Sequence, residues 1–435
     1  MSRTHGRVAK ALWSLALLFG AATLSLHVAG SPALSQAPRP TGFTDWGWPL
    51  PYEKISAASI RWLRERGWWP LQVAWQSPFS GQNTIMLVIR DLDLLGKRGI
   101  EARFHAFEAG PPINEAFLAG RIQVGVGGNF PFTTLLDRGV PLGVLAILAP
   151  NLGHAVVVPR ESPIRKLTDF KGRSAPAIVG IVTGSSAEFF FQSAAKVVGL
   201  DIGKDVVLKP MPPSEQALMP RGIDAVVPWD PTVALITEVR KTGRVVEWIF
   251  PYNFYQGNLY VPRELIENAA EVAQAITDAY VEAALWIRRY PEQALDIMAR
   301  EATLQVFPRG LLRQQIRLYN LLYKPTVYFP HADFWAEENS RIATWLRENG
   351  RLTREITYKT YFDSFQPRFM TQTFAKLGWR VPGRPVFLPP DWKGAIGTLP
   401  YPPYYNAATL KTPQPFPERG DLVRPWWFAG KLYSP

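Results

Sequence analysis

The sequence predicts an α/β fold in which two lobes meet at a hinge. Short apolar segments alternate with helical segments over residues 71–150, and the same alternation recurs over 151–254. A return strand and a long helical region at 255–345 then bring the chain back to the first lobe. Strands that alternate with helices at short spacing pair in parallel through right-handed crossovers, so each lobe should contain its own sheet.

The first 35 residues have the features of a secretory signal peptide. The basic residues Arg3, Arg7 and Lys10 come first. An apolar run over 11–29 follows, and then the small-residue pattern Ala33–Ser35 of a cleavage site. An uncleaved anchor is the alternative, because the run is nearly long enough to span a bilayer. Glycine and several alanines lower its hydrophobicity, so we expect cleavage and a periplasmic location.

The composition excludes several classes of site and partner. The 435-residue chain is 47% apolar, which is enough for two domain cores. It contains no cysteine, so disulfides, thiolate metal sites and cysteine nucleophiles are excluded. Removal of the three basic residues of the signal segment lowers the formal net charge from +12 to +9. The remaining basic residues are scattered, which favours solubility or mild steering of anionic ligands over nucleic-acid binding.

Two Pro- and Trp-rich regions flank the predicted lobes. Residues 36–70 contain one short predicted helix, Ile55–Arg66, and we interpret them as an N-terminal wrap packed on the main body. Residues 346–435 are predicted to be a helical and Pro/aromatic-rich C-terminal extension. From Gly378 onward this extension lacks the composition for a large core of its own. We expect that tail to lie extended over the body, and partner docking is the alternative.

Apolar residues at helical spacing predict the helices, and short apolar or alternating runs predict the strands. In lobe 1 these are a strand at 71–74, a loop at 75–83, a helix at 84–97, a strand at 101–108, a helix at 111–119, a strand at 122–126, a turn at 127–131, a helix at 132–137 and a strand at 141–149. In lobe 2 and the return they are an apolar segment at 154–159, strands at 175–182, 206–209, 223–227, 245–249 and 257–261, and helices from 185, at 213–219, 232–241 and 264–290.

The second lobe is organised around residues 173–191. Ala175–Val182 is an apolar strand, and Thr183–Gly184 is a tight turn. Ser185 and Glu188 have the spacing of a capping box at a helix start. Free N–H groups and the helix dipole favour a negatively charged group at such a start. The alternative is an ordinary strand–helix unit, in which the capping side chains bond the N–H groups of the helix start and no ligand binds there.

The lobes should enclose a ligand cleft. Two crossings between them, near 151–154 and 251–257, are expected to act as the hinge. Open α/β sheets bind ligands beyond the carboxyl ends of their strands. The strand ends predicted to face the shared cleft are 75–83, 127–131, 183–188 and 229–230.

Three motifs occur in one order along the chain: Leu118–Val126, then Lys171–Gly172 with Gly184–Ala187, then Gly222–Pro231. Together they resemble the periplasmic solute-binding proteins for nitrate, taurine and aliphatic sulfonates, which share their fold with the thiamine-pyrimidine synthase-like proteins. The resemblance covers about residues 71–345. It implies a two-lobed, type II periplasmic-binding-protein fold that serves an ABC importer.

The resemblance also implies which residues would touch a ligand. They lie in the first loop, at the Gly128–Phe130 turn, at the helix start near Ser185 and after the strand at 223–227. We predict no cofactor, no metal ligand and no catalytic residue. The predicted ligand-binding residues are Gln76, Ser77, Asn83, Gly128, Asn129, Phe130, Thr183, Ser185, Ser186, Trp229 and Asp230.

Several side chains in this region also have ordinary structural interpretations. Trp229 can be a core residue, because a buried Trp also needs a partner for its N–H group. Asp230 precedes Pro231 and can cap the following helix. His105 and His154 have no second residue at metal-ligand spacing, so we interpret both as structural.

We predict an extracytoplasmic solute-binding component of an ABC importer, and not an enzyme. It would act as a monomer with a membrane permease and an ATPase. Its ligand would be a small polar or anionic organic solute, sulfonate-, taurine- or nitrate-like or heterocyclic. The alternatives are a sensor or scaffold domain with the same cleft and an enzyme on the same fold. Enzymes of related fold depend on cysteine or a histidine–lysine arrangement, and the five histidines here form no recognisable nucleophile–base pair.

Overall fold

The computed structural model describes residues 46–148, 153–253, 255–322, 324–325, 332–381, 416–428 and 430–435. The predicted signal peptide at 1–35 lies outside these residues, as do the start of the predicted wrap and the tail segment 382–415. The described residues all belong to one compact unit. Among the described helices, none combines the length and the apolarity that a membrane span requires.

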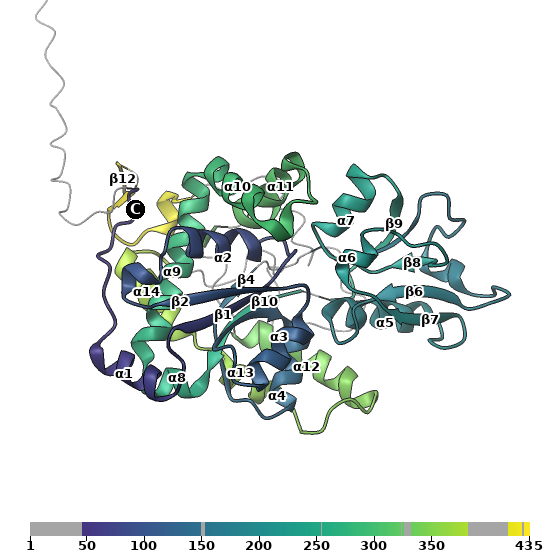
Figure 1. Cartoon of the computed structure of the whole chain (residues 1–435), viewed down its shortest axis with the longest axis horizontal. Helices are drawn as coiled ribbons and strands as arrows, with labels where there is room; N and C mark the ends of the chain where they lie inside the picture. The colour runs from purple at the N-terminus through teal and green to yellow at the C-terminus, as the bar shows by residue number, and fades with distance from the viewer. Residues whose placement is uncertain are drawn as a thin grey trace, which may run out of the picture. The chain divides into compact units, whose positions relative to one another are not determined.

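Lobe 1 is built on a mixed five-stranded sheet (Figure 1). Its strands are β1 (Leu71–Gln76), β2 (Ala102–Phe107), β3 (Val124–Gly128), β4 (Leu142–Leu148) and β10 (Gly257–Pro262). Their order is β2-β1-β3-β10-β4. β1 pairs in parallel with β2 and β3, whereas β10 pairs antiparallel with β3 and β4. β1, β3, β4 and β10 are almost fully buried, as the near-continuous apolar runs predict.

Helices that follow the strands of lobe 1 pack against this sheet. α9 is the longest of them and buries most of its residues, because its apolar side chains face the sheet and the surrounding helices. These helices are α2 (Gln82–Asp91), α3 (Gly110–Leu118), α4 (Asn129–Asp137), α8 (Arg263–Asn268) and α9 (Ala270–Arg289).

Lobe 2 repeats the arrangement on a second five-stranded sheet, in the order β7-β6-β8-β5-β9. β6 is parallel to β7 and β8, whereas β5 is antiparallel to β8 and β9. Separate apolar clusters fill the two faces of the sheet, and α5 belongs to the larger one. The elements are β5 (Ala155–Pro159), β6 (Ala177–Ile181), α5 (Ser186–Val198), β7 (Val206–Pro210), α6 (Pro213–Gln216), β8 (Ala225–Val226), α7 (Thr232–Ala234) and β9 (Gly243–Trp248).

The residues before β1 pack on lobe 1 around one buried ion pair. α1 (Ala57–Glu65) begins after Ser56, whose side chain accepts the N–H of Ser59. Arg98 and Glu282 form an ion pair of 2.7 Å, and their side chains are 3% and 0% exposed. Trp46 and Tyr52 donate hydrogen bonds of 3.0 and 2.7 Å to Glu282. A carboxylate in α9 therefore anchors the N-terminal segment to the core of lobe 1.

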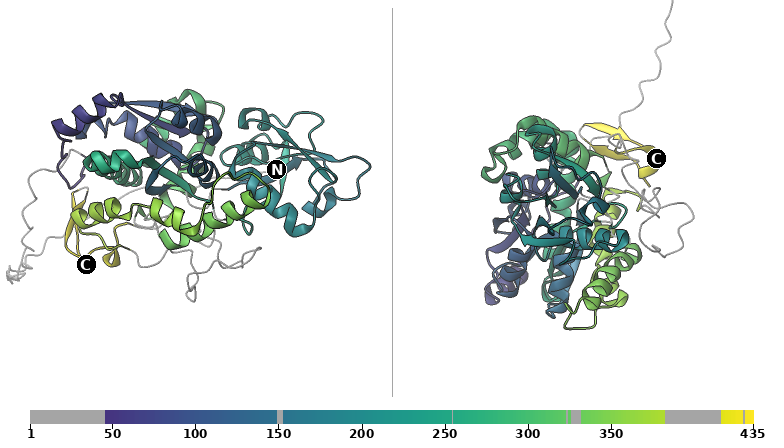
Figure 2. Two further views of the ribbon diagram at one scale, coloured as in Figure 1. Left: turned by 90° about the horizontal axis from the view of Figure 1, so that it is seen from below. Right: turned by 90° about the vertical axis from the view of Figure 1, so that its right-hand side faces the viewer.

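The C-terminal residues add helices and a short hairpin to lobe 1. The hairpin lies near the C-terminal end of the chain, coloured yellow in Figure 2. It packs against Trp379, whose ring lies edge-on at 5.3 Å from that of Trp426, and both side chains are buried. These elements are α10 (Pro291–Arg300), α11 (Arg309–Ile316), α12 (Ala332–Glu348), α13 (Tyr358–Ser364), α14 (Pro367–Leu377), β11 (Trp426–Phe428) and β12 (Lys431–Tyr433).

Several local predictions differ from the structure. The helix predicted over 84–97 ends at Asp91, and the helix predicted over 264–290 is divided into α8 and α9 at Ala269. The turn expected at 127–131 is wrong: β3 runs to Gly128 and α4 begins at Asn129, so the strand enters the helix directly. The expectation that the tail lies extended is wrong for its described part, since β11 and β12 pair as a hairpin. β3 extends to Gly128 because Gly128 pairs with Gly257 of β10, and the hairpin forms where Trp426–Phe428 pairs with Lys431–Tyr433. The domain boundaries drawn from the sequence remain predictions.

Candidate functional site

A small cavity lies between the two lobes at the ends of their strands. Its volume is about 10 Å³, which is close to the space that one water molecule needs. The strand ends of both lobes contribute to it, as the topology predicts. The lining residues are Gln76, Phe79, Gly128, Pro131, His154, Ser185, Ser186, Trp229 and Tyr255.

Aromatic side chains form one wall of this cavity. The ring of Phe79 lies 5.5 Å from that of Tyr255 and 6.4 Å from that of Trp229. The His154 ring lies 4.9 Å from Tyr255 and 5.8 Å from Trp229. All four side chains are buried. Such a wall offers flat, polarizable surface to the apolar part of a ligand.

Two polar atoms in the cavity lining have no hydrogen-bond partner among the residues that the structure describes. They are Oε1 of Gln76 and the hydroxyl of Tyr255, and the two residues are 4% and 1% exposed. Burial raises the pKa of Tyr255 well above its usual value, so its hydroxyl stays protonated at neutral pH. Unpaired buried polar groups are unfavourable. This cavity therefore presents one acceptor and one donor for a polar solute.

The helix start at Ser185 is capped, but not by the predicted capping box. The Ser185 hydroxyl donates to the carbonyl of Val182 over 2.6 Å and accepts the N–H of Glu188 over 3.4 Å. The Glu188 carboxylate accepts the N–H of Gly184 over 2.7 Å, one residue before the position that the capping box requires. Gly184 has φ of 77°, a left-handed conformation that glycine adopts without strain, and this turn brings its N–H toward the carboxylate.

The two lobes touch directly beside the cavity. The Ser186 hydroxyl in lobe 2 donates to Oδ1 of Asn129 in lobe 1 over 2.8 Å. The indole N–H of Trp229 donates to the carbonyl of Pro78 over 2.9 Å. A Cβ atom on Gly128 would lie 2.9 Å from the Ser186 hydroxyl, so glycine permits this close approach of the lobes. The structure therefore has its lobes closed on each other.

Asp230 lies behind the cavity wall and not in the lining. Its carboxylate accepts the Tyr319 hydroxyl over 2.6 Å and the N–H of Ala234 over 3.3 Å. Burial raises the pKa of Asp230 to about 6, against the opposing effect of these hydrogen bonds. Its contact with α7 fits the helix-capping interpretation, and its contact with Tyr319 joins lobe 2 to the helices after α11.

The structure brings together five of the predicted ligand-binding residues at the cavity: Gln76, Gly128, Ser185, Ser186 and Trp229. The others have different surroundings. Ser77 shares a hydrogen bond with Thr303, and Asn83 accepts the indole N–H of Trp75. Asn129 accepts the Ser186 hydroxyl, and Phe130 packs on Phe189. Thr183 is exposed, and Asp230 accepts the Tyr319 hydroxyl.

Sequence reasoning missed three lining residues, Pro131, His154 and Tyr255, whereas Phe79 belongs to the first loop, which the resemblance places against the ligand. Phe79 and Pro131 lie in segments that were predicted to face the cleft. His154 and Tyr255 lie in the two crossings between the lobes, and that position was the available signal. Metal-ligand spacing alone gives no signal at His154, because a single histidine at the end of a crossing has no second ligand nearby in the sequence.

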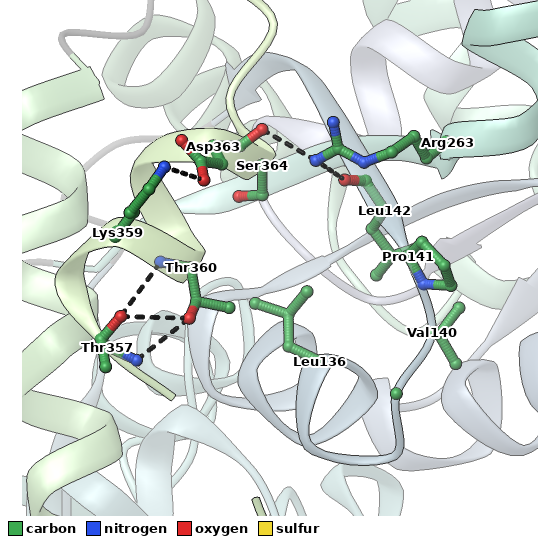
Figure 3. Close-up of a pocket in the computed structure, with 11 residues that line it drawn as sticks. Leu136, Val140, Pro141, Leu142, Arg263, Thr357, Lys359, Thr360, Asp363 and Ser364 are labelled. Atoms are coloured by element: carbon green, nitrogen blue, oxygen red, sulfur yellow. Dashed lines mark hydrogen bonds and ion pairs between the residues drawn. The ribbon is translucent and has the colours of Figure 1, made fainter. Parts of the chain in front are cut away.

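A second pocket of about 450 Å³ lies in lobe 1 between α13 and the end of α4 (Figure 3). It is larger than the interlobe cavity, but it is a surface hollow whose charged groups already have partners. Lys359 pairs with Asp363 over 2.6 Å, and Arg263 donates to the carbonyl of Asp363 over 2.8 Å. Because the interlobe cavity contains buried unpaired polar atoms, we take that cavity as the candidate site.

The candidate site offers hydroxyl and amide side chains together with the imidazole of His154. The described part of its lining contains no lysine, arginine or carboxylate. Among the described residues, no group of His, Asp and Glu side chains is arranged to hold a metal ion. Hydroxyl, amide and backbone groups at helix starts are therefore the polar contacts that this site can offer.

A comparison with family models assigns part of the chain. Residues 83–294 match the model of a family described as NMT1/THI5 like. No curated protein sequence matches the chain significantly.

The fold is similar to that of solved periplasmic binding proteins. The aliphatic sulphonate-binding protein of Escherichia coli has 21% identity and a TM-score of 0.57, over 67% of this chain and 96% of that chain. The alkanesulfonate-binding protein of Xanthomonas axonopodis pv. citri, bound to MOPS, has 17% identity and a TM-score of 0.57, over 68% of this chain and 97% of that chain. The nitrate-binding protein of Synechocystis PCC 6803 has 12% identity and a TM-score of 0.57, over 72% of this chain and 91% of that chain. The predicted fold class is thereby confirmed.

Proposed function

We propose that the chain, whose residues 83–294 match the NMT1/THI5-like family model and whose fold is that of periplasmic binding proteins, is a solute-binding protein. It would capture a small polar or anionic organic solute between its lobes and deliver that solute to the permease of an ABC importer. The observation that carries the proposal is the buried interlobe cavity with unpaired polar atoms on Gln76 and Tyr255.

We assign the head group of the solute to the start of α5. The helix dipole and the N–H of Ser186, the first residue of α5, favour negative charge there. The Tyr255 hydroxyl would donate a further hydrogen bond, and Gln76 Oε1 would accept one from the solute. The described lining contains no lysine or arginine, so we expect a solute with at most one negative charge.

The aromatic wall would hold the remaining part of the solute. Phe79, Trp229 and Tyr255 present ring surfaces on one side of the cavity. A sulfonate with a short organic chain and a small heterocycle both offer an apolar or flat part for such a wall. An inorganic ion such as nitrate lacks that part, so we expect it to bind more weakly.

Binding would require the lobes to separate and close again. The cavity of about 10 Å³ is too small for a solute of several heavy atoms. A solute that bridges both lobes would favour the closed form that accommodates it, by its differential affinity for the two forms. A closed, loaded form could then dock on a membrane permease. The protein would act in the periplasm after export.

A panel of solutes tests the proposal directly. Thermal unfolding of the mature protein should be followed with alkanesulfonates, taurine, nitrate, pyrimidines and aromatic acids. A ligand at 100 times its Kd should stabilise the native protein by about 2.7 kcal/mol. If no solute of these classes raises Tm, the proposed ligand class is wrong. Turnover of a stabilising solute would instead support the enzyme alternative.

The head-group assignment has its own test in two variants of Ser186. Ser186→Pro removes the N–H at the first position of α5, where proline is compatible with a helix. It should abolish binding of the solute found in the panel. Ser186→Ala removes only the hydroxyl contact with Asn129 and keeps the N–H, so it should retain most of the affinity. Equal affinities for the two variants would contradict the assignment.

A further inference from the structure

The chain segment from α12 to Arg354 contacts both lobes, although it lies beyond the residues that match the family model. α12 packs beside α4 of lobe 1, and the turn after it reaches α5 of lobe 2 (Figures 1 and 2). α4 and α5 are the helices whose first residues line the interlobe cavity or border it. The segment is therefore placed to affect how these two helix starts meet.

Asp137 fixes this segment to lobe 1. Its carboxylate, at the end of α4, accepts the N–H groups of Thr353 and Arg354, each over 2.8 Å. It also accepts the Thr353 hydroxyl over 3.0 Å. Asp137 is 5% exposed, whereas Thr353 and Arg354 lie at exposed positions, so the three hydrogen bonds are partly buried. Charge-assisted hydrogen bonds of this kind are about twice as strong as neutral ones.

Arg351 joins the same segment to lobe 2. Its guanidinium donates to both oxygens of Glu188 in α5, over 2.8 and 3.3 Å. The guanidinium also lies over the rings of Phe130 and Trp345, 5.5 Å from each ring centre. Glu188 in turn accepts the N–H of Gly184 in the turn before α5. One arginine thus reaches the helix start of lobe 2 through one carboxylate.

An apolar cluster completes the contact. It combines side chains from α4, α5 and α12, all of them buried: Phe130, Phe189, Ile342, Trp345 and Leu346. Phe130 belongs to lobe 1 and Phe189 to lobe 2, and their rings lie 6.3 Å apart. Separation of the lobes here would expose apolar surface as well as break the ion pair.

We propose that residues 332–354 form an interlobe clasp, in which Arg351 and the apolar cluster hold lobe 2 closed against lobe 1. The clasp sets the balance between closed and open forms without touching the solute. Loss of Arg351 removes a bidentate ion pair that only the closed form makes, so the open population rises about tenfold. Arg351 acts as a positioning residue, since it reaches the cavity only through Glu188 and Gly184.

The clasp can be tested without any solute, because the chain has no cysteine. Spin labels on Arg121→Cys in lobe 1 and Lys204→Cys in lobe 2, both at exposed positions, report the distance between the lobes by pulsed electron resonance. With native Arg351 we expect one narrow, short distance distribution. Arg351→Ala should add a longer distance whose population is about ten times that of the parent.

Two further variants keep the result interpretable. Glu188→Gln removes the charge but keeps an oxygen for the Gly184 N–H, so it should open the lobes even if Arg351→Ala fails to fold. Lys196→Ala is the matched control, because Lys196 pairs with Glu348 of α12 at an exposed position and should leave the distances unchanged.

Identical distance distributions for the parent and Glu188→Gln would overturn the clasp. A parent that is already open without solute would overturn it as well. Failure of every solute in the panel leaves these distances informative, so the clasp and the proposed function can fail separately.

Discussion

Lobes 1 and 2 use the same strand order but differ in what covers them. In each sheet the first three strands pair in parallel, and an antiparallel strand that follows a lobe crossing lies beside the third. That strand is β10 in lobe 1 and β5 in lobe 2. The N-terminal segment, α9 and the C-terminal helices cover lobe 1, whereas lobe 2 leaves Ile178 37% and Val207 44% exposed on one face of its sheet.

This difference shows that topology alone does not set burial. The elements added before β1 and after β10 pack on lobe 1, so that lobe gains a large continuous core. Lobe 2 has two smaller clusters, one on each face of its sheet. A large rigid lobe and a smaller one suit a hinge motion in which lobe 2 moves and the clasp limits that motion.

The largest expected effect concerns the buried ion pair that is particular to lobe 1. Glu282→Gln leaves Arg98 buried without a compensating charge, so we expect a loss of about 3–5 kcal/mol in the free energy of unfolding. Urea titration followed by circular dichroism measures it. Glu264→Gln is the control, because the Arg66–Glu264 pair is 46% and 41% exposed and should contribute at most about 1 kcal/mol.

The next effect concerns Asp230 of lobe 2. Its pKa is raised by burial to about 6 in the folded protein, so the folded state retains a proton that the unfolded state loses near pH 4. The parent should therefore lose stability as the pH rises from about 4 to 6, by on the order of 2–3 kcal/mol. Asp230→Asn should lack this loss and still accept the Tyr319 hydroxyl. Urea titrations between pH 4 and 7 measure the free energy of unfolding of both proteins. The same pH dependence in Asp230→Asn and in the native protein would contradict this prediction.

A smaller effect is expected where the lobes touch. Gly128→Ala places a Cβ atom 2.9 Å from the Ser186 hydroxyl and 3.1 Å from the Tyr255 hydroxyl, so the lobes cannot close fully. We expect about tenfold weaker affinity for the solute found in the panel, or about 1.4 kcal/mol, by calorimetry. Gly127→Ala meets no atom nearer than 3.6 Å and should bind like the parent. Equal losses in both variants would show that the contact is not specific.

The smallest effect tests the uncovered face of lobe 2. Val207→Thr changes a side chain that is 44% exposed and should alter the free energy of unfolding by less than about 0.5 kcal/mol. Val206→Thr on the same strand buries a hydroxyl at a position that is 0% exposed and should lose about 1–3 kcal/mol. Similar losses at both positions, measured by urea titration, would mean that Val207 is covered in solution.

Local patterns predicted most of the elements and one side of the candidate site. The Ser185 cap, the Gly184 turn and the helix after them could be predicted because each depends on residues within four positions. The ion pair between Glu188 and Arg351 could not be predicted. The two residues are 163 positions apart, and no local pattern at either residue indicates the pair. His154 and Tyr255 were missed for the same reason, since only closure of the lobes places the two crossings at the cavity.

The sequence by itself determined the order of strands and helices, the two crossings between lobes and the three motifs that resemble periplasmic solute-binding proteins, because these depend on apolar periodicity, caps and turn residues. Only the tertiary structure decided which side chains share the cavity, that Asp230 lies behind it, and that residues 332–354 contact both lobes. The physical reason is that such contacts form between residues distant in sequence, whose approach depends on the packing of both lobes as a whole.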